Sequence, residues 1–145
     1  MKKRFLIILP VLMAMVLVFT QCNDNKKDEC EDVDCREIFI SVFLTLEYPD
    51  GQPVLLDSTK VFWVGQNRYL EQDLFWWTSS RGFGIYVIVD DSMREKLFNR
   101  EEIMRFTAYL NGKIVHQRDV LVGADCCHVR HLGTESLVQV IPRAD

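Results

Sequence analysis

The sequence lacks the short motifs that mark common nucleotide-binding, hydrolytic and calcium sites. It contains no GxGxxG, P-loop or GxSxG motif and no EF-hand spacing, and no internal repeat is present. No long segment follows a helical period either, which argues against an α-helical architecture. Since no motif indicates an active site, a cofactor or a bound metal, we expect a chain that is not an enzyme and that needs no cofactor and no metal.

Basic residues are outnumbered, with 17 Lys and Arg against 21 Asp and Glu. Three of the basic residues and none of the acids lie in the first 21 residues, so residues 22–145 carry a formal charge of −7. An acidic surface of this kind argues against a nucleic-acid partner and against direct binding to anionic lipid headgroups.

The N-terminus has the layout of an export signal. Lys2-Lys3-Arg4 precedes an apolar run of 15 residues, from Phe5 to Phe19, which is shorter than the ~20 residues of a membrane-spanning helix. No Ala-x-Ala-like cleavage site follows the run. The segment resembles instead the lipobox of bacterial lipoproteins, in which the peptide is cut just before an acylated cysteine, and Cys22 occupies that position.

The lipobox resemblance implies an anchor and an address. Two or more acyl chains on Cys22 would hold the protein firmly to a membrane. The acidic, Asn-rich stretch after Cys22 is similar to the surface-export signal of Bacteroidota lipoproteins, which implies an outer-membrane and surface location in the cell envelope. A freely secreted protein and an uncleaved membrane anchor are the alternatives. We therefore divide the chain into a signal peptide (1–21), an acidic flexible tether (22–34) and a folded domain (35–145).

Four further cysteines form an even set: Cys30, Cys35, Cys126 and Cys127. In an exported chain an even number indicates disulfides. A bridge between the neighbours Cys126 and Cys127 would close a strained ring. We therefore expect Cys30 and Cys35 each to pair with one of these two residues.

The cysteine pair also lies in the one cluster that could be chemical, beside Asp125, His128 and His131. Cys, His and Asp are zinc ligands, and a reduced cysteine next to a histidine could be a nucleophile. Adjacent cysteines rarely bind one metal, and an oxidising compartment disfavours a free thiolate. We therefore prefer a disulfide loop to a metal site or a catalytic site.

Alternating apolar residues predict about seven short strands and an immunoglobulin-like β-sandwich. The expected strands are 36–48, 59–64, 68–77, 83–90, 102–110, 113–122 and 137–141. Asn111-Gly112 is a strong hairpin signal, residues 92–99 predict a short helix with Ser92 as its N-cap, and 123–133 predicts a loop. The tail from Val120 to Ile141 resembles the end of small Bacteroidota lipoprotein domains, which implies an immunoglobulin-like or transthyretin-like sandwich.

The aromatic run Phe75-Trp76-Trp77 cannot point to a single side of a strand. Trp76 and Trp77 are therefore candidate ligand-binding residues, because exposed aromatic rings stack on sugars or act as interface hot spots. Core packing is the alternative, and the same choice applies to Trp63, Tyr69 and Tyr86. For the acidic pairs Asp90-Asp91 and Glu101-Glu102 we expect solvated loops rather than calcium ligands or catalytic carboxylates.

These features predict a non-catalytic binding or accessory module at the cell envelope, with a membrane as partner through its lipid and a glycan or an envelope protein as ligand. The resemblance to surface lipoproteins, many of which capture glycans, favours the sugar. A structural or adhesive subunit that assembles by edge-strand pairing is the alternative, and an enzyme with a Cys–His or metal site is a third, more distant one.

Overall fold

The computed structural model describes residues 30–71 and 81–143, and in these residues strands predominate. The strands are β1 (Ser41–Glu47), β2 (Ser58–Trp63), β3 (Arg68–Tyr69), β4 (Ile85–Asp90), β5 (Glu102–Leu110), β6 (Lys113–Ala124), β7 (Val129–His131) and β8 (Val138–Val140). The short helical segments after β3 are η2 (Arg81–Phe83), η3 (Asp91–Met93) and α3 (Arg94–Leu97). The predicted all-β class is confirmed.

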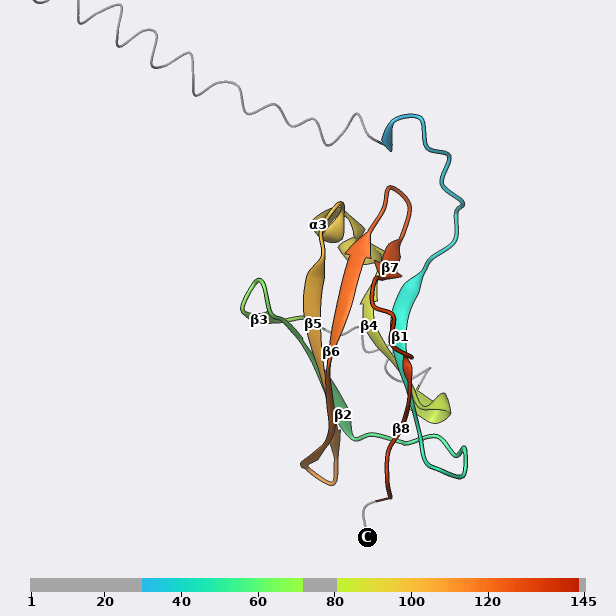
Figure 1. Cartoon of the computed structure of the whole chain (residues 1–145), viewed down its shortest axis with the longest axis vertical. Helices are drawn as coiled ribbons and strands as arrows, with labels where there is room; N and C mark the ends of the chain where they lie inside the picture. Colours follow the sequence, from blue (N-terminus) through green and yellow to red (C-terminus); the bar gives the residue numbers. More distant parts are fainter. Residues whose placement is uncertain (1–29, 72–80, 144–145) are drawn as a thin grey trace, which may run out of the picture. The chain divides into compact units, whose positions relative to one another are not determined.

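The strands form two sheets (Figure 1). A three-stranded sheet has the order β4-β1-β8, and a five-stranded sheet has the order β3-β2-β5-β6-β7. All neighbours are antiparallel except β1 and β8, which run parallel. The chain divides into two compact units, Met1–Val33 and Asp34–Asp145, and both sheets belong to the second unit.

The alternation in β1 decides which side of the three-stranded sheet faces the core. Val42, Leu44 and Leu46 are buried, whereas Phe43 between them is exposed. A pleated strand places successive side chains on opposite faces, so this pattern covers one face of the sheet and leaves the other open. The inward side chains of both sheets meet in a single hydrophobic core, to which Trp63, Tyr86 and Phe106 contribute the largest aromatic rings.

The hairpin between β5 and β6 forms where Asn111-Gly112 predicted it. Asn111 has φ 52° and Gly112 has φ 71°, as a two-residue turn between antiparallel strands requires.

Gly84, just before β4, is needed for a different reason. It has φ +68°, and a Cβ there would lie 2.5 Å from the carbonyl oxygen of Leu46. The position therefore excludes larger residues.

Tyr86 ties the core to the chain that crosses between the sheets. Its hydroxyl donates to the carbonyl of Val54 and accepts from the amide of Leu56, at 2.9 Å. Burial raises the pKa of Tyr86, so the hydroxyl stays protonated and can act as a donor. The buried Tyr86 hydroxyl thus has both of its hydrogen-bond partners, and these two bonds fix the segment that contains Val54 and Leu56.

Several predicted boundaries were wrong. Residues 36–40 lie outside β1, so Ile38, predicted to lie on the buried face, is exposed. The predicted loop 123–133 contains the end of β6 and all of β7. Ser92 is not an N-cap: Asp90 caps η3 by accepting from the Ser92 amide, and α3 has no side-chain cap. Of the predicted strand 68–77, Arg68–Tyr69 is a strand and residues 70–71 are not, whereas residues 72–77 lie outside the described residues.

Candidate functional site

The candidate aromatic residues differ in their exposure to solvent. Trp76 and Trp77 lie outside the described residues. Trp63 is only 2% exposed, and its Nε1 donates to Glu102 at 2.8 Å, so it belongs to the core. Tyr86 is buried as well, whereas Tyr69 is 61% exposed. Among the aromatic candidates that the structure describes, Tyr69 is therefore the one exposed to solvent.

Neighbouring strands hold the Tyr69 ring in place. Tyr69 lies opposite Phe62 in the β2–β3 pair, and the two ring centroids are 5.0 Å apart at an interplanar angle of 64°. This edge-to-face contact is a favoured aromatic geometry. An exposed ring that is already ordered loses little conformational freedom when a ligand stacks on it.

A lysine completes the cluster. The Lys60 Nζ atom is 5.7 Å from the centroid of the Tyr69 ring and 5.6 Å from that of Tyr109. We call Lys60, Phe62, Tyr69 and Tyr109 the tyrosine surface. Lys60 and Tyr109 were missed from the sequence, since only the pairing of β2 with β5 brings them together. The alternation in the predicted strand 59–64 places Lys60 and Phe62 on its outward face, and this pattern was the sequence signal that could have identified them as surface residues.

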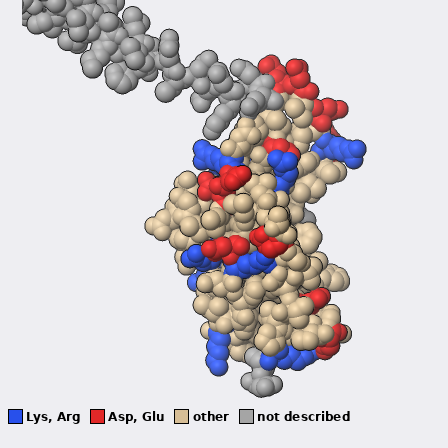
Figure 2. Space-filling view, viewed as in Figure 1, with Lys and Arg blue, Asp and Glu red and all other residues tan. Residues whose placement is uncertain are grey.

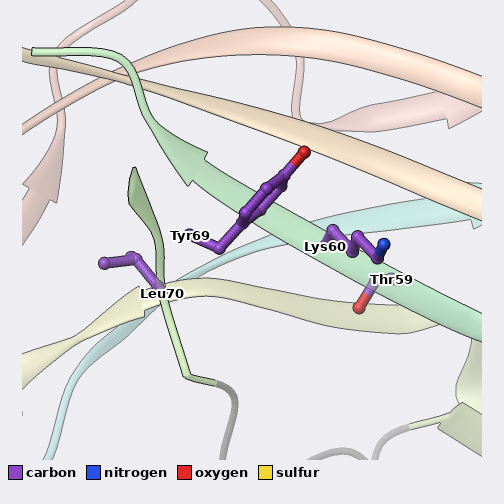
Figure 3. A pocket seen from close by; sticks show the side chains of 4 residues that line it. All are labelled: Thr59, Lys60, Tyr69 and Leu70. Atoms are coloured by element: carbon purple, nitrogen blue, oxygen red, sulfur yellow. The ribbon is translucent and has the colours of Figure 1, made fainter. Parts of the chain in front are cut away.

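The tyrosine surface borders an open depression of about 400 Å³, lined by Thr59, Lys60, Tyr69 and Leu70. Figure 3 shows the Tyr69 ring standing beside β2, with the Lys60 side chain extending along the same strand. The depression lies at the end of the two-residue strand β3, beside Leu70. Such a shape suits one unit of a chain-like ligand rather than a fully enclosed small molecule.

The side chains next to the tyrosine surface on the same sheet are polar and form hydrogen bonds with one another. Arg105 donates two hydrogen bonds to Asp119, at 2.7 and 2.9 Å, and these lower the pKa of that carboxyl group. Gln117 donates to the Thr107 hydroxyl at 3.1 Å. On the face drawn in Figure 2, positive and negative side chains also lie close together. The charges beside the site therefore largely compensate one another.

The cysteines form disulfides. Cys35 is bonded to Cys127 over a separation of 92 residues, and Cys30 and Cys126 are disulfide-bonded as well. The predicted disulfide bonding is confirmed, and the Cys35–Cys127 bridge agrees with the expected cross pairing. A disulfide sulfur is neither a thiolate nucleophile nor a zinc ligand, so these residues cannot support the Cys–His alternative while oxidised.

The two histidines near the cysteine pair have separate partners. His128 Nδ1 lies 2.8 Å from Asp91 Oδ2, whereas His131 Nε2 lies 3.4 Å from Glu135 Oε1. Within residues 30–71 and 81–143, no three His, Cys, Asp or Glu side chains are grouped as metal ligands. The described part of the cluster is thus organised by hydrogen bonds and disulfides.

Asp91 is the centre of that network, which corrects the expectation of a solvated acidic loop. Its carboxylate accepts from the amides of Ile40 and Val129, at 2.8 and 2.9 Å, and from His128. Burial opposes ionisation of Asp91, but these hydrogen bonds outweigh it and hold the pKa of the group below its ordinary value. Because a carboxylate only accepts, Nδ1 of His128 carries the proton. Asp91 therefore fastens the start of β1 to the cysteine loop.

The sequence matches no protein-family model, no curated protein and no solved structure. In the part of the chain that the structure describes, no helix has the length and apolarity needed to cross a bilayer. The features that bear on function are therefore the tyrosine surface, the disulfides and the sequence of the N-terminus.

Proposed function

We propose that this chain is an exported, lipid-anchored binding module of the bacterial cell envelope, with an immunoglobulin-like sandwich that carries a non-catalytic glycan site. Cys22 is its acylated residue, and the acidic tether (22–34) separates the lipid from the domain. The paired cysteines support an oxidising compartment outside the cytoplasm. The two sheets around one core support the sandwich.

The observation that carries the binding site is the ordered and exposed ring of Tyr69. A tyrosine combines an apolar face, on which the C–H face of a pyranose can stack, with a polar hydroxyl that can bond to sugar hydroxyls. The contact with Phe62 and the depression beside Lys60 give the ring a fixed orientation and a neighbouring space. Nothing in this arrangement requires bond cleavage, so capture is the function that it supports best.

A substitution at Tyr69 tests this proposal. We expect Tyr69→Ala to weaken glycan binding by about tenfold or more, since the stacking partner is lost. Tyr69→Phe keeps the ring and should retain most of the affinity. The measurement is binding of the disulfide-intact protein to a panel of immobilised neutral and acidic polysaccharides.

Phe83 supplies the matched control. It is 72% exposed, lies in η2 and is not among the residues of the tyrosine surface or of the depression beside it. Phe83→Ala should leave the affinity unchanged. Absence of binding to the whole panel, or equal losses for the Tyr69 and Phe83 variants, would reject the proposed glycan site.

A second function, assembly with further copies of the chain, is favoured by the outer face of the three-stranded sheet. This face is made by Ser41, Phe43, Thr45, Glu47, Ile85, Val87, Asp90, Val138 and Val140. The outward side of a two-sheet protein is ordinarily polar, but here Glu47 and Asp90 are its charged members, in the rows at opposite ends of the face. Although the chain is acidic, two copies could meet on this face with little like-charge repulsion.

Val140 and Ile114 allow a matched test of assembly, because each is 58% exposed on a strand. If copies pair through the outer face, Val140→Lys should weaken association by more than about tenfold, since a charge would be buried in the contact. Ile114→Lys on β6 should not. Light scattering coupled to size exclusion over a range of concentrations measures this. A wild-type protein that stays monomeric throughout excludes this second function.

A further inference from the structure

Within the residues that the structure describes, the cation of the tyrosine surface has no carboxylate partner. Lys60 is exposed, and its ammonium group lies near the two tyrosine rings. Among the ion pairs of residues 30–71 and 81–143, none includes Lys60. The charged side chains of Arg105 and Asp119, nearby on the same sheet, form an ion pair and so neutralise each other. Among the described residues, the positive charge of Lys60 on the tyrosine surface is therefore uncompensated.

This charge is unusual in its setting, because the whole chain has a formal charge of −4. An acidic protein repels anionic polymers at long range, but within a Debye length of about 8–10 Å local charges dominate. A lysine held between two aromatic rings is therefore placed to select an anion that has already reached the surface. A neutral sugar could accept a hydrogen bond from the ammonium group but would gain no ion pair.

We infer that the ligand of the tyrosine surface is an acidic polysaccharide with hexuronic acid units; this deepens the proposed glycan site and rests on it. The C–H face of a uronate ring stacks on Tyr69, and its carboxylate pairs with the Lys60 ammonium group beside that ring. Lys60 reaches both Tyr69 and Tyr109, so it can meet a carboxylate over either ring. The depression beside the ring is open, so it can receive one unit of a longer chain.

The test compares polygalacturonate with an uncharged glucan, with binding to the disulfide-intact protein measured by calorimetry at low and high salt. We expect polygalacturonate to bind at least about tenfold more tightly than the glucan, which corresponds to about 1.4 kcal/mol. Lys60→Gln should remove most of that difference, and Lys60→Arg should keep it. Lys113→Gln, at an exposed cation in the β5–β6 hairpin, should leave it unchanged. High salt should weaken polygalacturonate binding to the wild type more than to the Lys60→Gln variant.

The outcomes separate the two proposals. Equal affinity for both polymers, or an affinity for polygalacturonate that does not change in Lys60→Gln, would overturn the inference about uronic acids. The glycan site itself would stand in that case if Tyr69→Ala still lost binding. Failure of polygalacturonate to bind, with binding of the glucan that depends on Tyr69, would likewise overturn the inference and leave the glycan site standing. If Lys113→Gln and Lys60→Gln weaken polygalacturonate binding equally, the effect comes from the overall charge of the protein and not from Lys60. That result would also overturn the inference about uronic acids.

Discussion

Complete reduction of the disulfides is expected to lower the free energy of unfolding by about 7 kcal/mol, whereas loss of the Cys35–Cys127 bridge alone should lower it by only about 2.5 kcal/mol. The larger value is comparable to the whole stability of many small domains. We therefore expect the fully reduced protein to be largely unfolded near room temperature.

The unequal effects follow from the expected pairing. With Cys35 bonded to Cys127, the predicted cross pairing joins Cys30 to Cys126. Either bridge alone closes a loop of more than 90 residues, since Cys35 and Cys127 are 92 apart, and in the chain-entropy model this is worth about 4.6 kcal/mol. Once one bridge exists, the second closes only a small ring around the two cysteine segments. Such a ring of about eight residues contributes about 2.5 kcal/mol.

Denaturant unfolding of the wild type, with and without reductant, and of Cys35→Ser/Cys127→Ser measures both values. Replacing both residues of the bridge avoids leaving an unpaired thiol. The double variant should remain folded without reductant and lose the rest of its stability when reductant is added. If the variant is already as unstable as the reduced wild type, the remaining cysteines do not form a second long-range bridge and the predicted pairing is wrong.

The sequence was most informative where local chemistry alone decides the structure. Asn111-Gly112 can form a two-residue turn without any distant contact, and the alternation of Val42, Leu44 and Leu46 needs only one buried face. Strand ends were less predictable, because they depend on where a partner strand stops. Within the described residues, for example, β3 pairs with β2 only at Phe62 and Trp63, and Leu70 is already outside the strand.

The candidate site was harder to predict, because it depends on pairing between strands. Tyr69 was one aromatic candidate among several, and its exposure follows from its position on an edge strand. Lys60 and Tyr109 are 49 positions apart in the sequence and come together through the register of β2 with β5. Asp91 was also misjudged for this reason. Its partners Ile40, His128 and Val129 lie on distant segments, so nothing local marked it as buried.

Asp91→Asn is expected to destabilise the protein by roughly 3 kcal/mol at neutral pH. The Asp91 side chain is only 12% exposed, and it accepts hydrogen bonds from two amides and from His128. An asparagine of the same size keeps one acceptor oxygen and points an N–H group at one of these donors. A donor would then be left unpaired in a mostly buried site.

The same residue gives a dependence on pH with a definite sign. Because the pKa of Asp91 is lower in the folded state than its ordinary value, its stabilising effect is present above about pH 4 and is lost as the pH falls through the folded-state pKa. Other carboxyl groups with lowered pKa values add to acid unfolding, so the informative quantity is the difference in unfolding free energy between wild type and variant. For Asp91→Asn this difference should shrink below about pH 4.

Asp119→Asn is the matched control for that measurement. Asp119 also pairs with a cation and has a lowered pKa, but its side chain is 45% exposed and its partner Arg105 lies in solvent. Solvent screens such a pair, so Asp119→Asn should lower the free energy of unfolding at neutral pH by only a small fraction of the decrease expected for Asp91→Asn. Equal destabilisation by the two variants would mean that the Asp91 network does not hold β1 to the cysteine loop. A difference between wild type and Asp91→Asn that stays constant into acid would show that the carboxylate charge is not what stabilises this junction.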